Sequence, residues 1–175
     1  MIKLRNTNEL TGKDLHNLII NALGNAVEDY SNISEKPFIL KINRPYFIKF
    51  RIYIYNCGNP PGGRPLDEYK IVLNVGQKYG EQGNFDFSGG CFAIIAGYIR
   101  QFDVFVLWDV LKHKNFSFNK NLQVKLETIV KALSDPISMQ QRKTKNGDET
   151  IIVSRSQYLL EALLKRREIF CSDIL

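Results

Sequence analysis

The stretch Tyr46-Phe-Ile-Lys-Phe-Arg-Ile-Tyr-Ile-Tyr55 decides the class of fold, because its pattern repeats with a period of two. One face would carry Tyr46, Ile48, Phe50, Ile52 and Ile54, and the other Phe47, Lys49, Arg51, Tyr53 and Tyr55. Successive side chains of a β-strand point to opposite faces of a sheet, so we expect a long strand with one buried face. The second face interleaves cations with aromatic rings, and it would be either a nucleic-acid contact or an ordinary solvated face.

Strand patterns elsewhere predict a sheet around this segment. We expect strands over residues 67–75, 91–98, 103–110, 137–143 and 150–154. The run Val104-Phe-Val-Leu-Trp108 is apolar on both faces, as a central strand covered on both sides should be. Asn146-Gly147, between the last two strands, is typical of a tight hairpin turn.

The N-terminal part of the chain carries a helical period instead. Thr11 is a good N-cap for a helix that Gly24 would end. Its apolar positions are Leu15, Leu18, Ile19, Ala22 and Leu23. His16 lies off this apolar stripe, so we expect it at the surface.

Two more helices are predicted in the C-terminal half. The first has apolar positions at Leu122, Leu126, Ile129, Val130 and Leu133, with Asn119 or Asn121 as its cap and Pro136 at its end. Its N-terminal N–H groups could then face a phosphate. The last helix would begin at Ser156 and end in Lys165-Arg166-Arg167.

Together these elements predict an α+β fold: a seven-stranded, mostly antiparallel β pseudobarrel, closed or nearly closed, with flanking helices. The 175 residues fit a single domain. No apolar run approaches the length of about 20 residues that crosses a bilayer, and no secretory signal begins the chain. The three cysteines, Cys57, Cys91 and Cys171, form no metal-binding or disulfide pattern. We therefore expect a cytoplasmic protein without a metal or cofactor.

The positive charge is concentrated in one window. Residues 112–145 hold eight basic and two acidic residues, a net +6 that equals the formal charge of the whole chain. A polyanion would be drawn to this region, although a basic surface patch without a partner gives the same pattern.

Two loops have the composition of nucleic-acid recognition elements. In the first, the candidate residues are Gly63, Arg64, Asp67, Glu68 and Lys70. In the second, they are Lys112, His113, Lys114, Asn115, Ser117, Asn119 and Lys120. Arginine reads guanine through two hydrogen bonds, amide side chains read base edges and lysines neutralise phosphates. Further phosphate contacts are expected from Lys49, Arg51, Arg142, Lys143 and Lys145. Both loops could equally be ordinary surface loops.

Three alternatives stay open. Glu68-Tyr69-Lys70 has the spelling of a metal-dependent nuclease motif, but residues 36–66 contain no acidic partner. A reader of modified bases would need an aromatic pocket, for which Trp108, Phe116 and Phe118 are candidates that core packing explains more easily. A third alternative is a protein-interaction domain whose basic window binds an acidic partner.

A resemblance to a known family lies in four segments. They are Gly-Arg-Pro-Leu-Asp-Glu-Tyr-Lys-Ile71, Gly-Gly-Cys-Phe-Ala-Ile-Ile-Ala-Gly-Tyr98, Asp-Val-Phe-Val-Leu-Trp-Asp109 and His-Lys-Asn-Phe-Ser-Phe-Asn-Lys-Asn-Leu-Gln-Val124. Across residues 46–160 the chain is similar to the B-three-like, EcoRII-type pseudobarrels that bind DNA, and it resembles above all the N-terminal DNA-binding domains of LlaJI-type, McrB-like restriction endonuclease subunits.

The resemblance implies a sequence-specific module for double-stranded DNA in a bacterial restriction-modification system, without catalysis of its own. Residues 62–70 then match the N-arm and residues 112–120 the C-arm, two loops that enter the major groove. Residues 1–35 would be a helical extension, 36–155 the pseudobarrel and 156–175 a helix leading towards an AAA+ GTPase domain. That domain and an McrC-like nuclease subunit are the implied partners.

Overall fold

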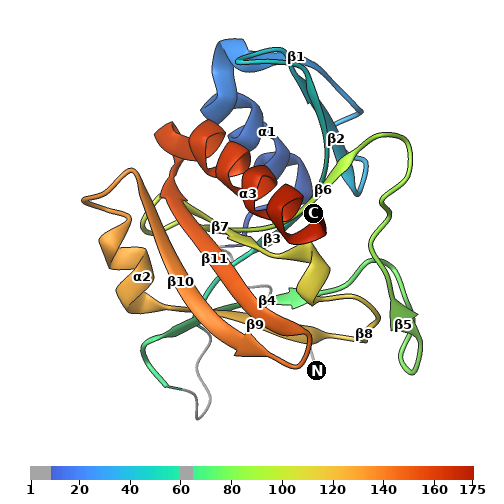
Figure 1. The fold of residues 1–175 in the computed structure, drawn as a ribbon, viewed down its shortest axis with the longest axis vertical. Helices are drawn as coiled ribbons and strands as arrows, with labels where there is room; N and C mark the ends of the chain where they lie inside the picture. The colour runs from blue at the N-terminus through green and yellow to red at the C-terminus, as the bar shows by residue number, and fades with distance from the viewer. Residues whose placement is uncertain (1–8, 60–64) are drawn as a thin grey trace.

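The computed structural model describes residues 9–59 and 65–175, and it has the predicted α+β architecture (Figure 1). Its main sheet has seven strands, in the order β1-β2-β3-β6-β7-β11-β10. The strands are β1 (Val27–Tyr30), β2 (Phe38–Ile42), β3 (Ile48–Asn56), β6 (Phe92–Ile99), β7 (Val104–Trp108), β10 (Ile137–Thr144) and β11 (Gly147–Arg155). Every neighbouring pair is antiparallel except β3 and β6.

The sheet does not close into a barrel. Its edge strands, β1 and β10, pair with one neighbour each and not with one another in the described part of the chain. Two short ribbons stand apart from it, one of β4 (Glu68–Leu73) with β9 (Lys120–Lys125) and one of β5 (Gln82–Gly83) with β8 (Phe116–Ser117). The seven-stranded, mostly antiparallel, pseudobarrel-like sheet is thus confirmed, and it is an open one.

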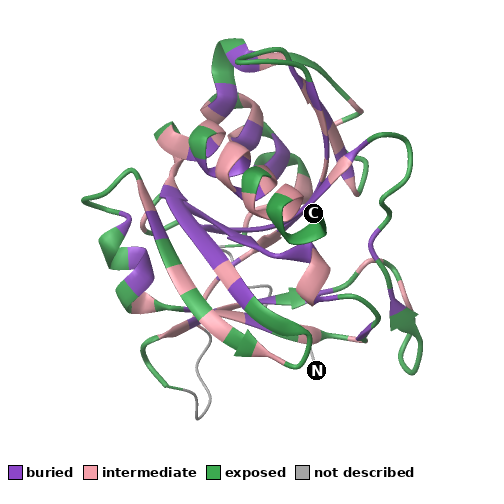
Figure 2. Ribbon diagram, in the orientation of Figure 1, coloured by how far each residue is buried: buried purple, intermediate pink, exposed green. Residues whose placement is uncertain are grey.

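Two hydrophobic cores lie on the two faces of the sheet. Helices α1 (Gly12–Leu23) and α3 (Leu159–Ile174) lie against one face, and the β4–β9 ribbon with α2 (Leu126–Lys131) covers the other (Figure 1). Neighbouring residues of the central strands alternate between the cores: Leu107 faces the helices and Trp108 the ribbon. All five residues of β7 are therefore buried, as predicted for an apolar central strand (Figure 2).

The first helix is confirmed, but its histidine is not at the surface. Thr11 and Asp14 form a reciprocal capping box, and Gly24 follows the helix. His16 is only 1% exposed and stacks on Phe38, with ring centroids 4.4 Å apart. Its Nδ1 lies 2.6 Å from the Ile33 carbonyl oxygen, which satisfies the buried ring. Segments outside the helix bury this position, so the prediction of a surface residue was wrong.

The second face of β3 is covered by protein, contrary to both interpretations of its pattern. Arg51 donates to the carbonyl oxygens of Asp86 and Ser88 at 2.8 and 3.0 Å. The Tyr53 hydroxyl accepts from the Asp86 N–H, and the Tyr55 hydroxyl donates to the Asn74 carbonyl. The long connection between β4 and β6 thus lies over this face, so Arg51 serves the fold and is poorly placed to meet a phosphate.

The second predicted helix begins later than its apolar spacing suggested. Residues 120–125 form strand β9, which pairs along its whole length with β4, and α2 has only six residues and no capping side chain. Leu122 and Val124 fit a period of two as well as a helical period, and both side chains are buried on the inner face of the ribbon. The expected helix cap at Asn119 or Asn121, and the phosphate site at that N-terminus, were wrong.

The C-terminal elements follow the prediction closely. A turn at Lys145 and Asn146 joins β10 to β11, with Gly147 at φ 104°. Helix α3 continues past its basic triplet to Ile174, since Arg166 turns inward and pairs with Asp109 at 3.2 Å. Three short 3-10 helices, η1 (Gly24–Ala26), η2 (Val110–Lys112) and η3 (Ser156–Tyr158), complete the structure.

The segment 1–35 is more than a helical extension. Its residues 27–30 form β1, which pairs with β2 as an edge of the main sheet. None of the helices in the described ranges is sufficiently long and apolar to cross a membrane.

His16 should make the stability of the fold depend on pH. Burial lowers the pKa of His16 below its usual 6.5, although the hydrogen bond to Ile33 opposes this. As pH falls through about 6.5, His16 becomes protonated in the unfolded chain but stays neutral in the folded chain, so the free energy of unfolding falls.

We expect His16→Asn, which keeps a donor for the Ile33 carbonyl but does not titrate, to lose less stability than the wild type between about pH 7.5 and pH 5. Urea unfolding at several pH values measures this difference. Parallel stability curves for the two proteins would contradict it.

Candidate nucleic-acid interface

A groove of about 580 Å³ opens between the C-arm and the β10–β11 hairpin. Its walls come from η2, β8, β9 and β10, with one residue from β5. It is lined by Gln82, Lys112, His113, Asn115, Phe116, Ser117, Lys120, Asn121, Leu122, Gln123, Arg142, Lys143, Thr144 and Lys145. The groove thus unites two segments that lie well apart in the sequence.

Most of the predicted C-arm residues meet here. The groove collects Lys112, His113, Asn115, Ser117 and Lys120 from the C-arm, and Arg142, Lys143 and Lys145 from the hairpin. Lys114 and Asn119 are exposed on the same loop but do not line the groove. Lys49 reaches the Gly89 carbonyl on the face of β3, and Arg51 is held there too, so the structure does not bring these two into the groove.

A buried carboxylate joins the two walls. Glu149, on β11, is fully buried, and its Oε1 lies 2.7 Å from His113 Nε2 and 3.1 Å from the Asp109 N–H. Its Oε2 accepts from Arg142 Nε at 2.5 Å. Burial would raise the pKa of Glu149, but His113 and Arg142 outweigh it and hold the pKa below its usual value. The carboxylate stays ionised and fixes both partners.

The neighbours of His113 determine where its proton lies. An ionised carboxylate only accepts hydrogen bonds, so Nε2 donates to Glu149. A lysine ammonium only donates, so Nδ1, at 3.3 Å from Lys120 Nζ, accepts. His113 is 2% exposed, and it therefore supports the floor of the groove and orients Lys120 instead of presenting a free edge.

Lys120 is repelled by its like-charged neighbours. Partial burial lowers its pKa, as do Lys145 and Arg142, while Glu149 acts in the opposite direction. Cations held this close favour an anion between them, because an added negative charge would relieve their repulsion.

The asparagines of the C-arm have a structural role in the backbone. Asn115 and Asn119 have φ of 52° and 56°, in the left-handed region where asparagine is tolerated better than most residues. Both side chains are exposed. They shape the tight turns of the loop and leave their amides accessible to a partner.

Neighbouring elements hold the C-arm in place. Strand β8, inside the arm, pairs with β5, and Phe118 meets Tyr79 edge to face at 6.1 Å. Asn146 Nδ2, in the hairpin turn, donates to the Lys112 carbonyl at 2.9 Å. Lys112 also lies 3.8 Å from Asp173 on α3. These contacts hold the C-arm in one conformation, so its charged side chains have fixed positions.

The described part of the N-arm, residues 65–70, leads into strand β4 of the β4–β9 ribbon. Gly63 and Arg64 fall outside the described residues, whereas Asp67 is exposed just before β4. Glu68 and Lys70 lie on β4, opposite Lys125 and Gln123, and Lys70 Nζ donates to Asn121 Oδ1 at 3.4 Å. Because β4 and β9 are antiparallel, Asp67, just before β4, and Lys120, at the start of β9, lie at opposite ends of the ribbon, about 17 Å apart for six residues.

The alternative sites gain no support. In the described part of the chain, no group of three or more His, Cys, Asp or Glu residues could hold a metal. Trp108 and Phe116 are buried in the core, and Trp108 donates to the Gln123 carbonyl, so neither can line an open aromatic pocket at the arms.

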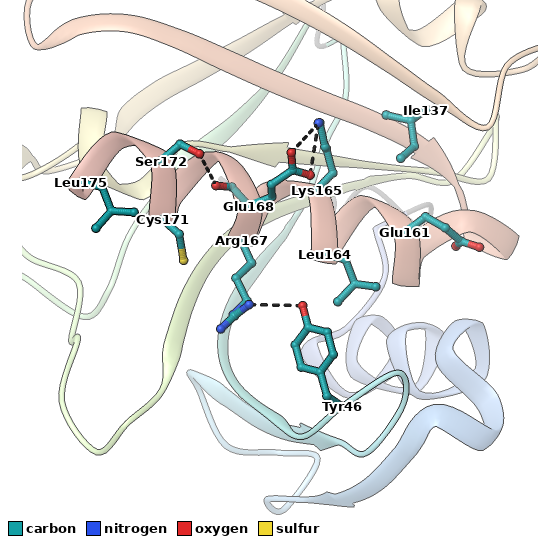
Figure 3. A pocket seen from close by; sticks show the side chains of 10 residues that line it. All are labelled: Tyr46, Ile137, Glu161, Leu164, Lys165, Arg167, Glu168, Cys171, Ser172 and Leu175. Atoms are coloured by element: carbon teal, nitrogen blue, oxygen red, sulfur yellow. Dashed lines mark hydrogen bonds and ion pairs between the residues drawn. The ribbon is translucent and has the colours of Figure 1, made fainter.

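Another groove runs along the outer side of α3 (Figure 3). It has a volume of about 630 Å³, and Arg167 reaches across it to the Tyr46 hydroxyl at 3.2 Å. Its charges are mixed, with Lys165 paired to Glu168 along the helix. None of the predicted site residues lines it.

Sequence reasoning missed Glu149, although the hairpin contained a signal for it. With a two-residue turn at Lys145 and Asn146, Thr144 pairs with Gly147, and counting back places Arg142 opposite Glu149. Opposite charges at facing positions of a hairpin form cross-strand pairs. That His113 would join the pair could not be read locally, because it comes from a loop 36 residues away in sequence.

The comparisons with known proteins gave one match. The sequence model of a family described as methylase-associated X1 (MTaX1) matches residues 48–163. This range runs from β3 into α3 and contains every residue that lines the basic groove. The comparisons with curated proteins and with solved structures found no match.

Replacing Glu149 should destabilise the fold strongly. Glu149→Gln leaves Arg142 and His113 without their carboxylate, and removing one member of a buried ion pair costs about 3–5 kcal/mol. Glu127→Gln is the matched control, because Glu127 pairs with Lys131 at the exposed surface of α2, where such pairs contribute little. Urea unfolding measures both. Equal stability of the two variants would show that the buried network does not hold the walls together.

Proposed function

The chain belongs to the methylase-associated X1 family, and from this premise we propose that it is a sequence-specific, double-stranded DNA recognition module of a bacterial restriction-modification system. The family description suggests a domain associated with restriction-modification. The finer assignment, to a B-three-like and LlaJI-type module that holds the major groove with two arms, rests on the resemblance of the arm segments and on the groove beside the C-arm.

The observation that supports DNA most strongly is the set of cations around one concave surface. Lys112, Lys120, Arg142, Lys143 and Lys145 line the groove, and no carboxylate among the described residues lines it, because Glu149 is fully buried behind His113 and Arg142. DNA carries one negative charge for about every 1.7 Å of helix axis, and basic side chains that neutralise its phosphates release counterions. A concave basic surface of this kind favours a polyanion as the partner.

The uncharged lining favours DNA over an acidic protein. Protein interfaces are enriched in exposed aromatic and other apolar side chains, but the two such residues of the groove, Phe116 and Leu122, are only 2% and 1% exposed. The accessible lining holds amides and a hydroxyl instead, from Gln82, Asn115, Ser117, Asn121 and Gln123. These groups can hydrogen-bond the edges of bases.

The spacing of the arms suits a duplex. The distance of about 17 Å along the ribbon from Asp67 to Lys120 exceeds the major groove width of about 12 Å, so these two ends of the ribbon could contact a groove from its two borders. Between them the outer face of the β4–β9 ribbon offers Lys70, Asn121 and Lys125, which are not buried. In this arrangement lysines position the backbone, while Arg64 and Asn115 read bases.

The proposed role is binding, with chemistry supplied by other components. The resemblance implies an AAA+ GTPase domain and an McrC-like nuclease subunit as partners, and both belong to the proposal. The nuclease alternative has only Glu68 and Lys70, and Glu68 faces Lys125 across the ribbon instead of a second carboxylate.

Removing two lysines of the groove should weaken binding to every sequence. We expect Lys143→Ala combined with Lys145→Ala to lower affinity and to reduce the salt dependence of log K by up to about 2, since each phosphate that is no longer neutralised lowers the slope by roughly 0.9. The control is Lys13→Ala with Lys131→Ala, which removes the same charge from α1 and α2. Fluorescence anisotropy across a salt series measures both. An equal effect in the control would mean that net charge, and not the groove, attracts DNA.

Arg64 should affect specificity more than affinity. We expect Arg64→Ala to lower the preference for one cognate base pair by about 1–3 kcal/mol, because arginine reads guanine through two hydrogen bonds. Arg100→Ala, at the exposed β6–β7 turn, is the control. Competition binding with cognate and random duplexes measures the preference. The same decrease in affinity for both duplexes would rule out base reading by Arg64.

A further inference from the structure

One edge of β3 is paired at both ends and open in the middle. Strand β2 pairs with it from Ile48 to Ile52. Further along the same edge, Gly58 exchanges two backbone hydrogen bonds with Lys70 of β4, at 3.1 and 2.8 Å. The part of β3 between these two pairings is opposite neither strand, since it lies before the first residue of β2 and beyond the part of β4 that reaches β3.

The open part comprises two residues whose backbone faces this edge, Ile54 and Asn56. Odd-numbered residues of this strand bond towards β6, as the Cys57 N–H does with the Tyr98 carbonyl. Even-numbered residues therefore face the other edge. Beside this gap the side chain of Asn56 exchanges hydrogen bonds with the backbone of Leu10 at 3.1 and 2.8 Å. The N–H and C=O of Ile54 have no partner among the described residues of that edge.

A pocket of about 490 Å³ lies over this gap. Its lining includes Pro37, Ile52, Ile54, Val72 and Val75, so the walls are largely apolar. This volume is typical of a site for a small molecule, in which a few polar groups orient the ligand between apolar walls. Buried backbone groups almost always have a hydrogen-bond partner. A ligand in this pocket would supply the partner that the backbone N–H and C=O of Ile54 lack among the described residues.

A second polar group reaches the pocket from α1. His16 lines it, and because a carbonyl only accepts, His16 Nδ1 must donate to Ile33. The other nitrogen, Nε2, is then an acceptor, and no described residue bonds to it. Besides the polar residues Lys36 and Asn74 in its lining, the pocket thus presents one donor and one acceptor side by side on Ile54 and a further acceptor on His16.

The pocket adjoins the basic groove. Its wall residue Val72 lies opposite Asn121 in the β4–β9 ribbon, and Asn121 lines the groove. Paired strands are about 4.8 Å apart, so one strand pair separates the two sites. Tyr79 follows the pocket residues Val75 and Gly76 in sequence, is 90% exposed and contacts Phe118 of the C-arm.

We propose that this pocket receives a single nucleobase extruded from the bound duplex, and that the backbone N–H and C=O of Ile54, which have no partner among the described residues, read its edge. This inference rests on the proposed function, since it requires that the adjoining groove holds DNA. A nucleobase is planar and carries donors and acceptors side by side on its edge, as the Ile54 pair demands. In this proposal the exposed ring of Tyr79 fills the space that the extruded base leaves between the stacked bases of the duplex.

A peptide strand fits the gap less well. Addition of a strand to a sheet edge depends on a series of main-chain hydrogen bonds, and here the gap between the β2 and β4 pairings spans only Ile54 and Asn56. An unpaired base needs one such donor and acceptor, and the apolar walls can hold its faces.

The test uses duplexes that the chain itself selects from a randomised pool, with 2-aminopurine placed at one position at a time. Extrusion removes this base from the stack and raises its fluorescence. We expect a severalfold rise at one position with the wild type, and none with Val72→Trp, which fills the pocket from an exposed strand position. Met139→Trp, at an exposed position of β10 outside the pocket, should keep the rise.

The outcomes separate the two proposals. If duplexes bind but no position gains fluorescence, or if the rise persists in Val72→Trp, the pocket does not hold a base while DNA binding stands. If no duplex binds, both proposals fall. As a measurement without a variant, the amide resonance of Ile54 in the wild type should shift when the selected duplex is added, and an unmoved resonance in the bound state would also overturn the inference.

Discussion

The buried carboxylate of Glu149 is the constraint on which the site depends. It lies on β11, in the core of the sheet, yet it holds His113 of the C-arm and Arg142 of the hairpin at hydrogen-bond distance. A fully buried charge is tolerated only when it is paired and hydrogen-bonded, so the loop and the hairpin must remain where they are. The groove between them is therefore a preformed surface, and its cations are available in the unbound protein.

The open sheet explains how one chain can build two neighbouring sites. The β4–β9 ribbon forms a layer separate from the main sheet. The basic groove lies on the β9 side of this ribbon, and the pocket lies on its β4 side. Because β2 and β4 each pair with only part of the β3 edge, the backbone donor and acceptor of Ile54 have no partner on that edge among the described residues.

The sequence predicted the elements with a single clear period and failed where two periods coincided. Val104–Trp108, the Asn146 turn and the capped first helix were all found, since each has one local cause. Leu122 and Val124 suit a strand and a helix alike, and only pairing with β4 decides between them. The fates of His16 and Arg51 depend on segments distant in sequence, as does the pairing of His113 with Glu149. The concentration of basic residues in the sequence predicted the position of the groove. The buried carboxylate of Glu149 could be found only from the register of the β10–β11 hairpin.

We propose that this member of the methylase-associated X1 family reads a DNA sequence through the two arms and the groove beside the C-arm. The most direct measurement is selection from a fully randomised pool of duplexes by the purified chain, carried out at a stated salt concentration near about 0.15 M, where purely electrostatic binding is weak. The account predicts that one short motif is enriched over successive rounds. A pool that binds but stays random, or that does not bind at all, would contradict it.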